Sequence, residues 1–202
     1  MRGLQAARGT PITSTAPADR TAGVRQRWLF VAVALGGLTL DALTKIIAVR
    51  LLDPQQPVVL FGGLLTLRLI RNPGAAFSLG EQYTFLFALL ALLVIGFVIV
   101  RLVPQLRHAG WAVALGLLCA GVTGNLSDRL FRTPGFLRGH VVDFLQLPYL
   151  PVFTRPIFNV ADIYITSAAV LIMVLAVIKN VGLNGERYAG AAVDGAAPER
   201  ER

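Results

Sequence analysis

Two aspartates stand where an acid–base reaction could use them. Asp162 lies in FNVADIYITSAAVLIMVLAVI, residues 158–178, a run long and apolar enough to span a bilayer. A carboxylate that faces lipid costs roughly 2.5 to 3.5 kcal/mol or more, so an aspartate in such a run needs a partner or a function. Asp143, in GHVVDF, is the second carboxylate that could reach the same membrane surface.

A pair of this kind could hydrolyse a peptide bond. Two carboxylates a few ångströms apart share one proton, because their like charges raise one pKa and leave the other group ionised. The ionised member can deprotonate water, while the protonated member polarises the carbonyl and then protonates the leaving amine. This chemistry needs neither a metal ion nor a covalent intermediate, and we expect no cofactor. The alternative is structural, with Asp143 in a loop turn and Asp162 as a partner of the helix dipole.

Other polar residues lie at helical spacings in apolar runs. Asp41 and Lys45 are four residues apart, a spacing that by itself indicates a charge pair that neutralises itself within a helix bundle. Asn125, Asp128 and Arg129 in GNLSDR share one helix face if the helix continues that far. Their structural alternative is a capped and solvated helix end.

The composition shows which elements must hold these residues. The chain has 202 residues, of which 55% are hydrophobic and 15% charged, and its mean hydropathy is +0.65. These values are typical of an integral membrane protein, and we expect a mainly α-helical fold with four transmembrane helices. The expected helices are Trp28–Val49, Tyr83–Val100, Trp111–Leu126 and Ile157–Ile178.

Four helices place both termini on one side of the membrane, and Arg25 and Arg27 before the first helix favour the cytoplasm. In this orientation all the polar residues above converge at the outer leaflet, together with Asn159 at the start of the fourth helix. Asn72 and Asp143 then lie in two outer loops. The first of these, PVVLFGGLLTLRLIRNPGAAFSL, has short β-favouring runs around a Gly-Gly pair and predicts a small extracytoplasmic sheet.

The remaining features limit the classes of function. We expect residues 1–27 to be a disordered basic tail, 28–180 to be the membrane domain and 181–202 to be a cytoplasmic tail. The single Cys119 excludes an internal disulfide framework, and with two histidines it leaves no Cys/His metal set. The net charge of +8 comes from dispersed basic residues, so we expect no nucleic-acid partner.

Five segments occur in an order that resembles the motifs of the signal peptidase II family, the bacterial lipoprotein signal peptidases: DALTK (41–45), RNPGAAFS (71–78), GNLSDR (124–129), GHVVDF (139–144) and FNVAD (158–162). The resemblance implies an aspartyl endopeptidase of the bacterial plasma membrane with its active site near the outer face. Its expected partners are lipid-modified prolipoproteins, cut just before the diacylglyceryl-modified cysteine, and membrane lipids.

The resemblance also assigns expected roles to residues. Asp143 and Asp162 match the catalytic pair. Asn72, Asn125, Arg129 and Asn159 match residues that bind substrate or support the pair, and Asp41, Lys45 and Asp128 match structural polar supports. Two residues depart from the pattern: His140 stands where Tyr is frequent, and Ile163 stands where a small polar residue is common. We expect His140 to pack at the surface rather than act as a base.

Two other functions would also place charges inside a membrane. A proton-coupled transporter or small channel needs polar residues along the full depth of a path. The second expected helix and residues 168–178 are almost wholly apolar, so no such path is visible. A noncatalytic membrane scaffold is the other alternative, and it predicts that both aspartates can be replaced without loss of function.

Overall fold

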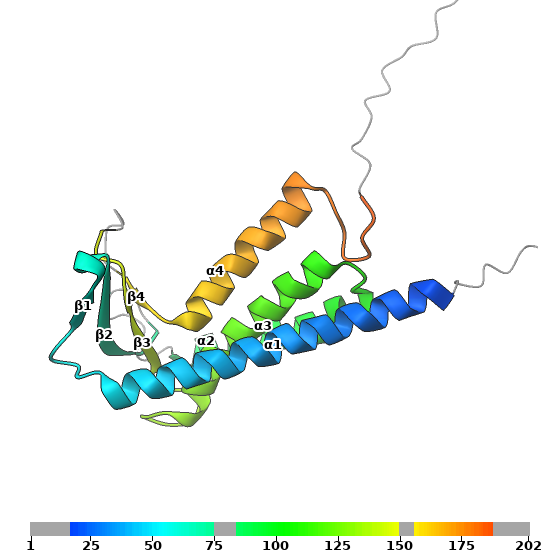
Figure 1. Ribbon diagram of the computed structural model, residues 1–202. Helices are drawn as coiled ribbons and strands as arrows, with labels where there is room; N and C mark the ends of the chain where they lie inside the picture. Colours follow the sequence, from blue (N-terminus) through cyan, green and yellow to red (C-terminus); the bar gives the residue numbers. More distant parts are fainter. Residues whose placement is uncertain (1–16, 75–83, 150–155, 188–202) are drawn as a thin grey trace, which may run out of the picture.

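The computed structural model describes residues 17–74, 84–149 and 156–187. Within these residues four long helices alternate with short strands (Figure 1). The helices are α1 (Pro17–Leu51), α2 (Thr84–Phe97), α3 (Ala109–Phe131) and α4 (Val160–Met173). A π-helical turn extends α2 over Val98–Leu102, and another extends α4 over Val174–Ile178. Each of these four helical stretches is long and apolar enough to cross a membrane.

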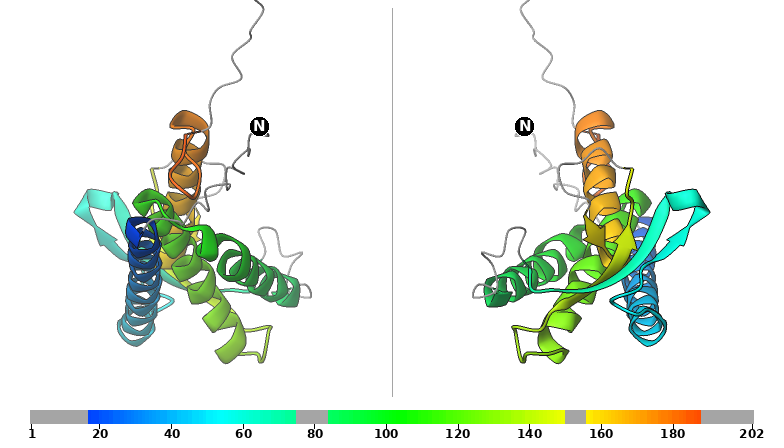
Figure 2. Two further views of the ribbon diagram at one scale, coloured as in Figure 1. Left: turned by 90° about the vertical axis from the view of Figure 1, so that its right-hand side faces the viewer. Right: turned by 90° about the vertical axis from the view of Figure 1, so that its left-hand side faces the viewer.

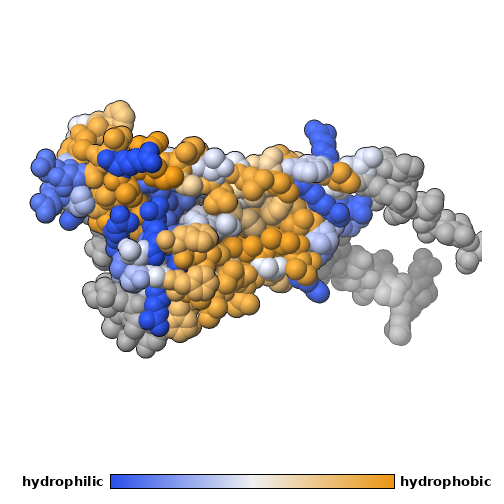
Figure 3. All heavy atoms as spheres, turned by 90° about the horizontal axis from the view of Figure 1, so that it is seen from below, coloured by the Kyte–Doolittle hydropathy of each residue, from blue (hydrophilic) through white to orange (hydrophobic). Residues whose placement is uncertain are grey.

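Helix α3 lies in the middle of the bundle. It contacts α1, α2 and α4, which radiate from it in the views along the bundle (Figure 2). Half of its apolar stretch is buried inside the protein, whereas the other three helices expose most of theirs. Apolar residues therefore cover the middle of the helices, with hydrophilic residues gathered at both ends (Figure 3). This is the surface of a protein whose helices face lipid.

A small antiparallel sheet closes one end of the bundle, which we call the sheet end (Figure 1). Its strands, in spatial order, are β1 (Val58–Leu60), β2 (Leu65–Asn72), β3 (Val141–Gln146) and β4 (Ile157–Phe158). The link between β1 and β2 is a short turn in which Gly62 and Gly63 adopt positive φ, a conformation that favours glycine. The sheet packs on the end of α1 through a buried apolar cluster of Ala48, Leu69, Val142 and Phe144.

This fold confirms the expected mainly α membrane protein with four helices and a small sheet. Several helix boundaries differ from the predictions. The third helix continues past Leu126 to Phe131, and the fourth begins at Val160 because Ile157 and Phe158 pair with β3 instead. GHVVDF was expected in a loop, but most of it belongs to β3, where it pairs with β2 on one side and β4 on the other.

The first helix begins at Pro17 rather than Trp28, so the expectation of a disordered tail is wrong for residues 17–27. The segment TAGVRQR, residues 21–27, contains good helix formers but no apolar period, which is why the pattern did not reveal it. Residues 1–16 and 188–202 of the two expected tails lie outside the described residues. Residues 181–187, the described part of the expected C-terminal tail, fold back on the start of α3. There the Trp111 indole donates to the carbonyl oxygen of Val181 at 2.9 Å.

Candidate active site

The strand β3 buries one of the two candidate catalytic carboxylates. Asp143 is only 2% exposed. Its Oδ2 accepts a hydrogen bond from Asn72 Nδ2 at 2.8 Å, and its Oδ1 accepts one from Asn159 Nδ2 at 2.6 Å. Burial raises the pKa of Asp143 to about 6, against the opposing effect of the Asn72 amide and with a further contribution from the charge of Asp162. Asp143 is therefore the carboxyl that holds a proton more readily than an ordinary aspartate.

The start of α4 presents the second carboxylate. Asn159 is the N-cap, and its Oδ1 accepts from the Asp162 backbone N–H while the Asp162 carboxylate accepts from the Asn159 backbone N–H at 3.0 Å. The other oxygen of Asp162 accepts from Asn125 Nδ2 at 2.8 Å. Asp162 thus lies in the first turn of α4, half-buried, and closer to the helix end than a start at Ile157 predicted.

Asn159 joins the two carboxylates. Its side-chain amide donates to Asp143, and its backbone N–H donates to Asp162. The same amide nitrogen also lies 3.1 Å from Asn125 Oδ1, so residues of α3 and α4 meet the strand β3 at one point. The structure therefore brings Asn72, Asn125, Asn159, Asp143 and Asp162 together, as the sequence predicted.

Asp41 and Lys45 do not simply neutralise each other within α1. Lys45 Nζ lies 2.8 Å from Asp41 Oδ2, 2.9 Å from Asp128 Oδ2 and 3.0 Å from Asn125 Oδ1. Lys45 and Asp41 are each 1% exposed. Asp128 also pairs with Arg132, a residue that the sequence reasoning missed. The spacing of four residues between them on α3 could have identified it.

Arg129 follows Asp128 on α3 and reaches toward α2. Its Nη1 donates to the Asn125 carbonyl oxygen at 3.0 Å, and its guanidinium carbon lies 5.7 Å from the centre of the Phe87 ring. It lines a cavity of about 220 Å³ between α2, α3 and α4. The charges of Asp143 and Asp162 act on its guanidinium, although neither carboxylate is hydrogen-bonded to it within the described residues.

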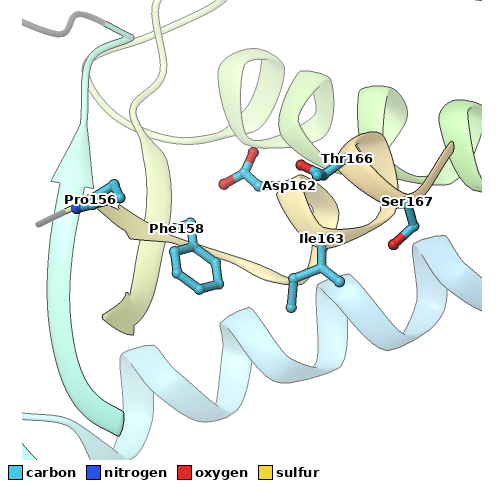
Figure 4. Close-up of a pocket in the computed structure, with 6 residues that line it drawn as sticks. All are labelled: Pro156, Phe158, Asp162, Ile163, Thr166 and Ser167. Atoms are coloured by element: carbon cyan, nitrogen blue, oxygen red, sulfur yellow. The ribbon is translucent and has the colours of Figure 1, made fainter. Parts of the chain in front are cut away.

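A second cavity, of about 390 Å³, opens beside Asp162 (Figure 4). Apolar side chains dominate its lining, and the Asp162 carboxylate points toward the sheet from the start of α4. It is lined by Pro156, Phe158, Asp162, Ile163, Thr166 and Ser167. Ile163, which departs from the expected motif, therefore faces this cavity rather than the carboxylate pair. His140 is half-buried in the turn between α3 and β3, where its backbone N–H donates to the Thr133 carbonyl oxygen.

The arrangement can perform acid–base chemistry on a bond brought to the sheet end. It offers two neighbouring carboxylates in unlike environments, one buried and one lining a cavity of mainly apolar side chains. Within the described residues no group of three or more His, Cys, Asp or Glu side chains is arranged to hold a metal ion.

Comparison with known proteins agrees with these features. The family model described as "Signal peptidase (SPase) II" matches residues 33–178. A lipoprotein signal peptidase of Leifsonia xyli subsp. xyli is 42% identical over 193 residues, which are 95% of this chain and 87% of that protein. A lipoprotein signal peptidase of Mycobacterium avium is 46% identical over 168 residues, 83% of this chain and 87% of that protein.

Two solved structures, each described as a bacterial membrane enzyme, have the same fold. One matches with a TM-score of 0.60 and 24% identity over 80% of this chain and 94% of its own. The other matches with a TM-score of 0.59 and 26% identity over 73% and 92%. Because the family model matches most of the chain, and both relatives align with more than four fifths of it, this multi-pass membrane protein is a peptidase that belongs to the signal peptidase II family.

Proposed function

We propose that this protein is an aspartyl endopeptidase that removes signal peptides from prolipoproteins by cutting just before a diacylglyceryl-modified cysteine. One observation carries the proposal: Asp143 of β3 and Asp162 of α4 both accept hydrogen bonds from Asn159, beside a cavity with a mainly apolar lining. The names of the relatives support the substrate class. No observation favours a transporter or a noncatalytic scaffold.

Asp143 and Asp162 take different parts in the proposed reaction. Asp143 is buried and its pKa is raised to about 6, so we assign to it the proton that the pair shares. Asp162 is at the N-terminus of α4, where it accepts two N–H hydrogen bonds and lines the cavity, so we assign it the role of the base. Asp162 therefore takes a proton from water as the water oxygen attacks the scissile carbonyl carbon, and Asp143 protonates the carbonyl oxygen. When the tetrahedral intermediate collapses, the C–N bond breaks, Asp162 gives the proton it took from water to the cysteine amine, and Asp143 takes back a proton from the hydroxyl group that becomes the new carboxyl carbonyl.

The surrounding residues hold the pair and the substrate. Asn72, Asn125 and Asn159 fix the carboxylate oxygens by hydrogen bonds and need no charge to do so. Arg129 Nε is buried and has no hydrogen-bond partner among the described residues. Because an unpaired buried donor is costly, we assign Arg129 to the substrate, where it can donate to a backbone carbonyl of the signal peptide.

The proposal includes an orientation in the membrane. Arg25, Arg27, Arg101 and Lys179 flank the helices at the end opposite the sheet. Under the positive-inside rule that end is cytoplasmic, with both termini, and the sheet end is at the outer face. A reporter fused to the C-terminus is expected to give a cytoplasmic signal, and an extracytoplasmic signal would reverse the orientation.

The decisive experiment is cleavage of a diacylglyceryl-modified prolipoprotein by the purified protein. We expect release of the signal peptide by the wild type and a loss of at least about a thousandfold in Asp143→Asn and Asp162→Asn, since an amide cannot exchange the proton. Asp53→Asn is the matched control, because Asp53 is an exposed aspartate in the turn after α1. Membrane insertion should be kept in all three variants, and Asp162→Asn and Asp53→Asn should also keep the melting temperature of the wild type. Turnover near that of the wild type in either dyad variant would reject the aspartyl mechanism, and no cleavage by the wild type would favour a scaffold.

A further inference from the structure

The residue before each catalytic aspartate is held by a second aspartate. Asp41 Oδ1 accepts the backbone N–H of Ala161 at 2.9 Å, and Ala161 precedes Asp162. Asp128 Oδ2 accepts the backbone N–H of Val142 at 3.2 Å, and Val142 precedes Asp143. The strand β3 and the helix α4 are thus held in the same way: in each, an aspartate accepts the backbone N–H of the residue before the catalytic aspartate.

Lys45 connects these two tethers. Its ammonium lies 2.8 Å from Asp41 and 2.9 Å from Asp128, and it is 1% exposed. Asp41 comes from α1 and Asp128 from α3, so the cation sets the separation of the two tethering carboxylates. A change in that separation would move Ala161 relative to Val142, and with them the two catalytic carboxylates.

Lys45 also fixes the orientation of an amide that holds the pair. Its third contact is Asn125 Oδ1 at 3.0 Å. Because an ammonium only donates, this contact requires the oxygen of the Asn125 amide to face Lys45. The amide nitrogen then faces Asp162 and donates to it at 2.8 Å. Reversal of the amide would place an oxygen against the Asp162 carboxylate.

We propose that Lys45 is a positioning residue of the peptidase reaction, which sets the relative placement of the two catalytic carboxylates through Asp41, Asp128 and Asn125. This inference rests on the proposed function, because it takes Asp143 and Asp162 as the reacting pair. Lys45 does not touch the substrate in this role. It acts through the backbone before each carboxylate and through the amide beside one of them.

The test removes Lys45 together with one of its two carboxylates, so that the net charge of the cluster does not change. Lys45→Met alone would leave Asp41 buried without a cation and Asp128 with Arg132 alone, which opposes folding. The double variants K45M/D41N and K45M/D128N each remove one cation and one anion, and the new amide oxygen can still accept the backbone N–H. R50M/D53N is the matched control, since Arg50 and Asp53 are exposed near the same end of α1.

We expect both double variants to lose kcat by at least about tenfold while KM changes by less than about twofold, because a misplaced pair slows the chemical step and the cavities are untouched. The control should keep both constants. The pH dependence gives a readout that a purely structural role would not move. Lys45 from α1 lowers the pKa of Asp143, which also faces Arg129 from α3 and Asp162 from α4. Loss of Lys45 should therefore move the Asp143 limb of the kcat/KM profile to higher pH.

A folded double variant that keeps kcat within about twofold of the wild type, with an unchanged pH limb, would overturn the proposal. If neither double variant folds, Lys45 belongs to the fold alone, and the proposal is also overturned. These results are separate from a failure of the aspartyl mechanism. That failure would appear as turnover in Asp143→Asn or Asp162→Asn, whatever happens at Lys45.

Discussion

The two ends of the helix bundle are built from different interactions. At the sheet end the buried residues include three aspartates, a lysine and an asparagine: Asp41, Lys45, Asp128, Asp143 and Asn159. At the opposite end the buried cluster is apolar and consists of Phe30, Val98, Leu106, Ala112, Leu115 and Cys119. Backbone hydrogen bonds from Arg107 and His108 to the Leu183 carbonyl oxygen close that end.

Helix α3 crosses both ends, and its glycines show what the difference means. A Cβ on Gly116 would lie 2.8 Å from the Val33 Cβ and 3.1 Å from the Phe30 carbonyl oxygen of α1. A Cβ on Gly124 would lie 2.4 Å from Asp41 Oδ2. Both glycines permit close packing of α1 on α3, but only Gly124 leaves room for a carboxylate that holds the catalytic helix. The apolar end serves stability, whereas packing at the sheet end also sets the geometry of the site.

We expect the two ends to differ most when the same substitution, glycine to alanine, is made in α3 at each end. Gly124→Ala should lower kcat about a hundredfold, because displacement of Asp41 releases the Ala161 N–H and shifts Asp162. Gly116→Ala should cost about 1 to 3 kcal/mol of stability by overpacking. The folded fraction of this second variant should keep its kcat within about twofold, since the apolar end does not touch the site.

Melting temperature and single-turnover cleavage, measured on the same purified samples, separate the two outcomes. Equal losses of kcat in both glycine variants would show that the ends are coupled through α3. The contrast between a stabilising end and a reacting end would then be wrong.

The second prediction concerns the substrate. A prolipoprotein without the diacylglyceryl group should be cut at least about tenfold more slowly, because each buried CH₂ adds about 0.8 kcal/mol of membrane attachment and the lipid places the adjacent bond. Asp162 stands at a cavity with a mainly apolar lining, and a soluble peptide has little reason to enter it. The measurement is kcat/KM for matched precursors in one detergent. Equal values would mean that the protein, and not the lipid, positions the bond.

The third prediction uses the unlike environments of the two carboxylates. The pKa of Asp143 is raised to about 6, so Asp143 loses its proton as the pH rises through that value. In the proposed mechanism it must be protonated to act as the acid. We therefore expect kcat/KM to fall about fivefold between pH 6 and pH 7, the change in the protonated fraction of a group with this pKa. A profile that rises over this interval would exchange the roles of Asp143 and Asp162.

The same shift predicts an effect on stability. A carboxyl whose pKa is higher in the folded state favours folding below its ordinary value of 3.8 and opposes it as the pH rises toward about 6. The melting temperature of Asp143→Asn relative to the wild type should therefore increase from pH 4 to pH 7. A constant difference would show that Asp143 does not titrate in this range.

Much of the site could be predicted from the sequence, because five short motifs each carry a polar residue in an otherwise apolar chain. The hydrogen bonds of Asp41 and Asp128 to the backbone could not be predicted, because their donors are the N–H groups of residues distant in the sequence. A side-chain pattern contains no signal for such a donor. The Asp41–Lys45 spacing suggested a pair without other partners for the same reason, because the sequence of one helix does not show which residues of another helix contact it.

The predicted limits of helices and strands were wrong where local sequence preference and strand pairing favour different structures. Ile157 and Phe158 continue the apolar run of α4, but they pair with β3, and Asn159 then caps the helix. The short run Val141–Gln146 resembles a buried loop as much as a strand until β2 lies beside it. Pairing partners, rather than propensity, decided both cases.

The smallest effect is expected at the N-terminus, and it tests whether the opposite end has any part in catalysis. Deletion of residues 2–16 removes a segment without apolar periodicity and leaves α1 intact from Pro17. Arg27, which donates to the Pro104 carbonyl oxygen at 2.6 Å, remains to hold α1 against the segment before α3 and to favour a cytoplasmic N-terminus. We therefore expect kcat/KM within about twofold of the wild type in correctly inserted protein. A large loss of turnover with normal insertion would show that this segment reaches the site or its substrate, and function would no longer be confined to the sheet end.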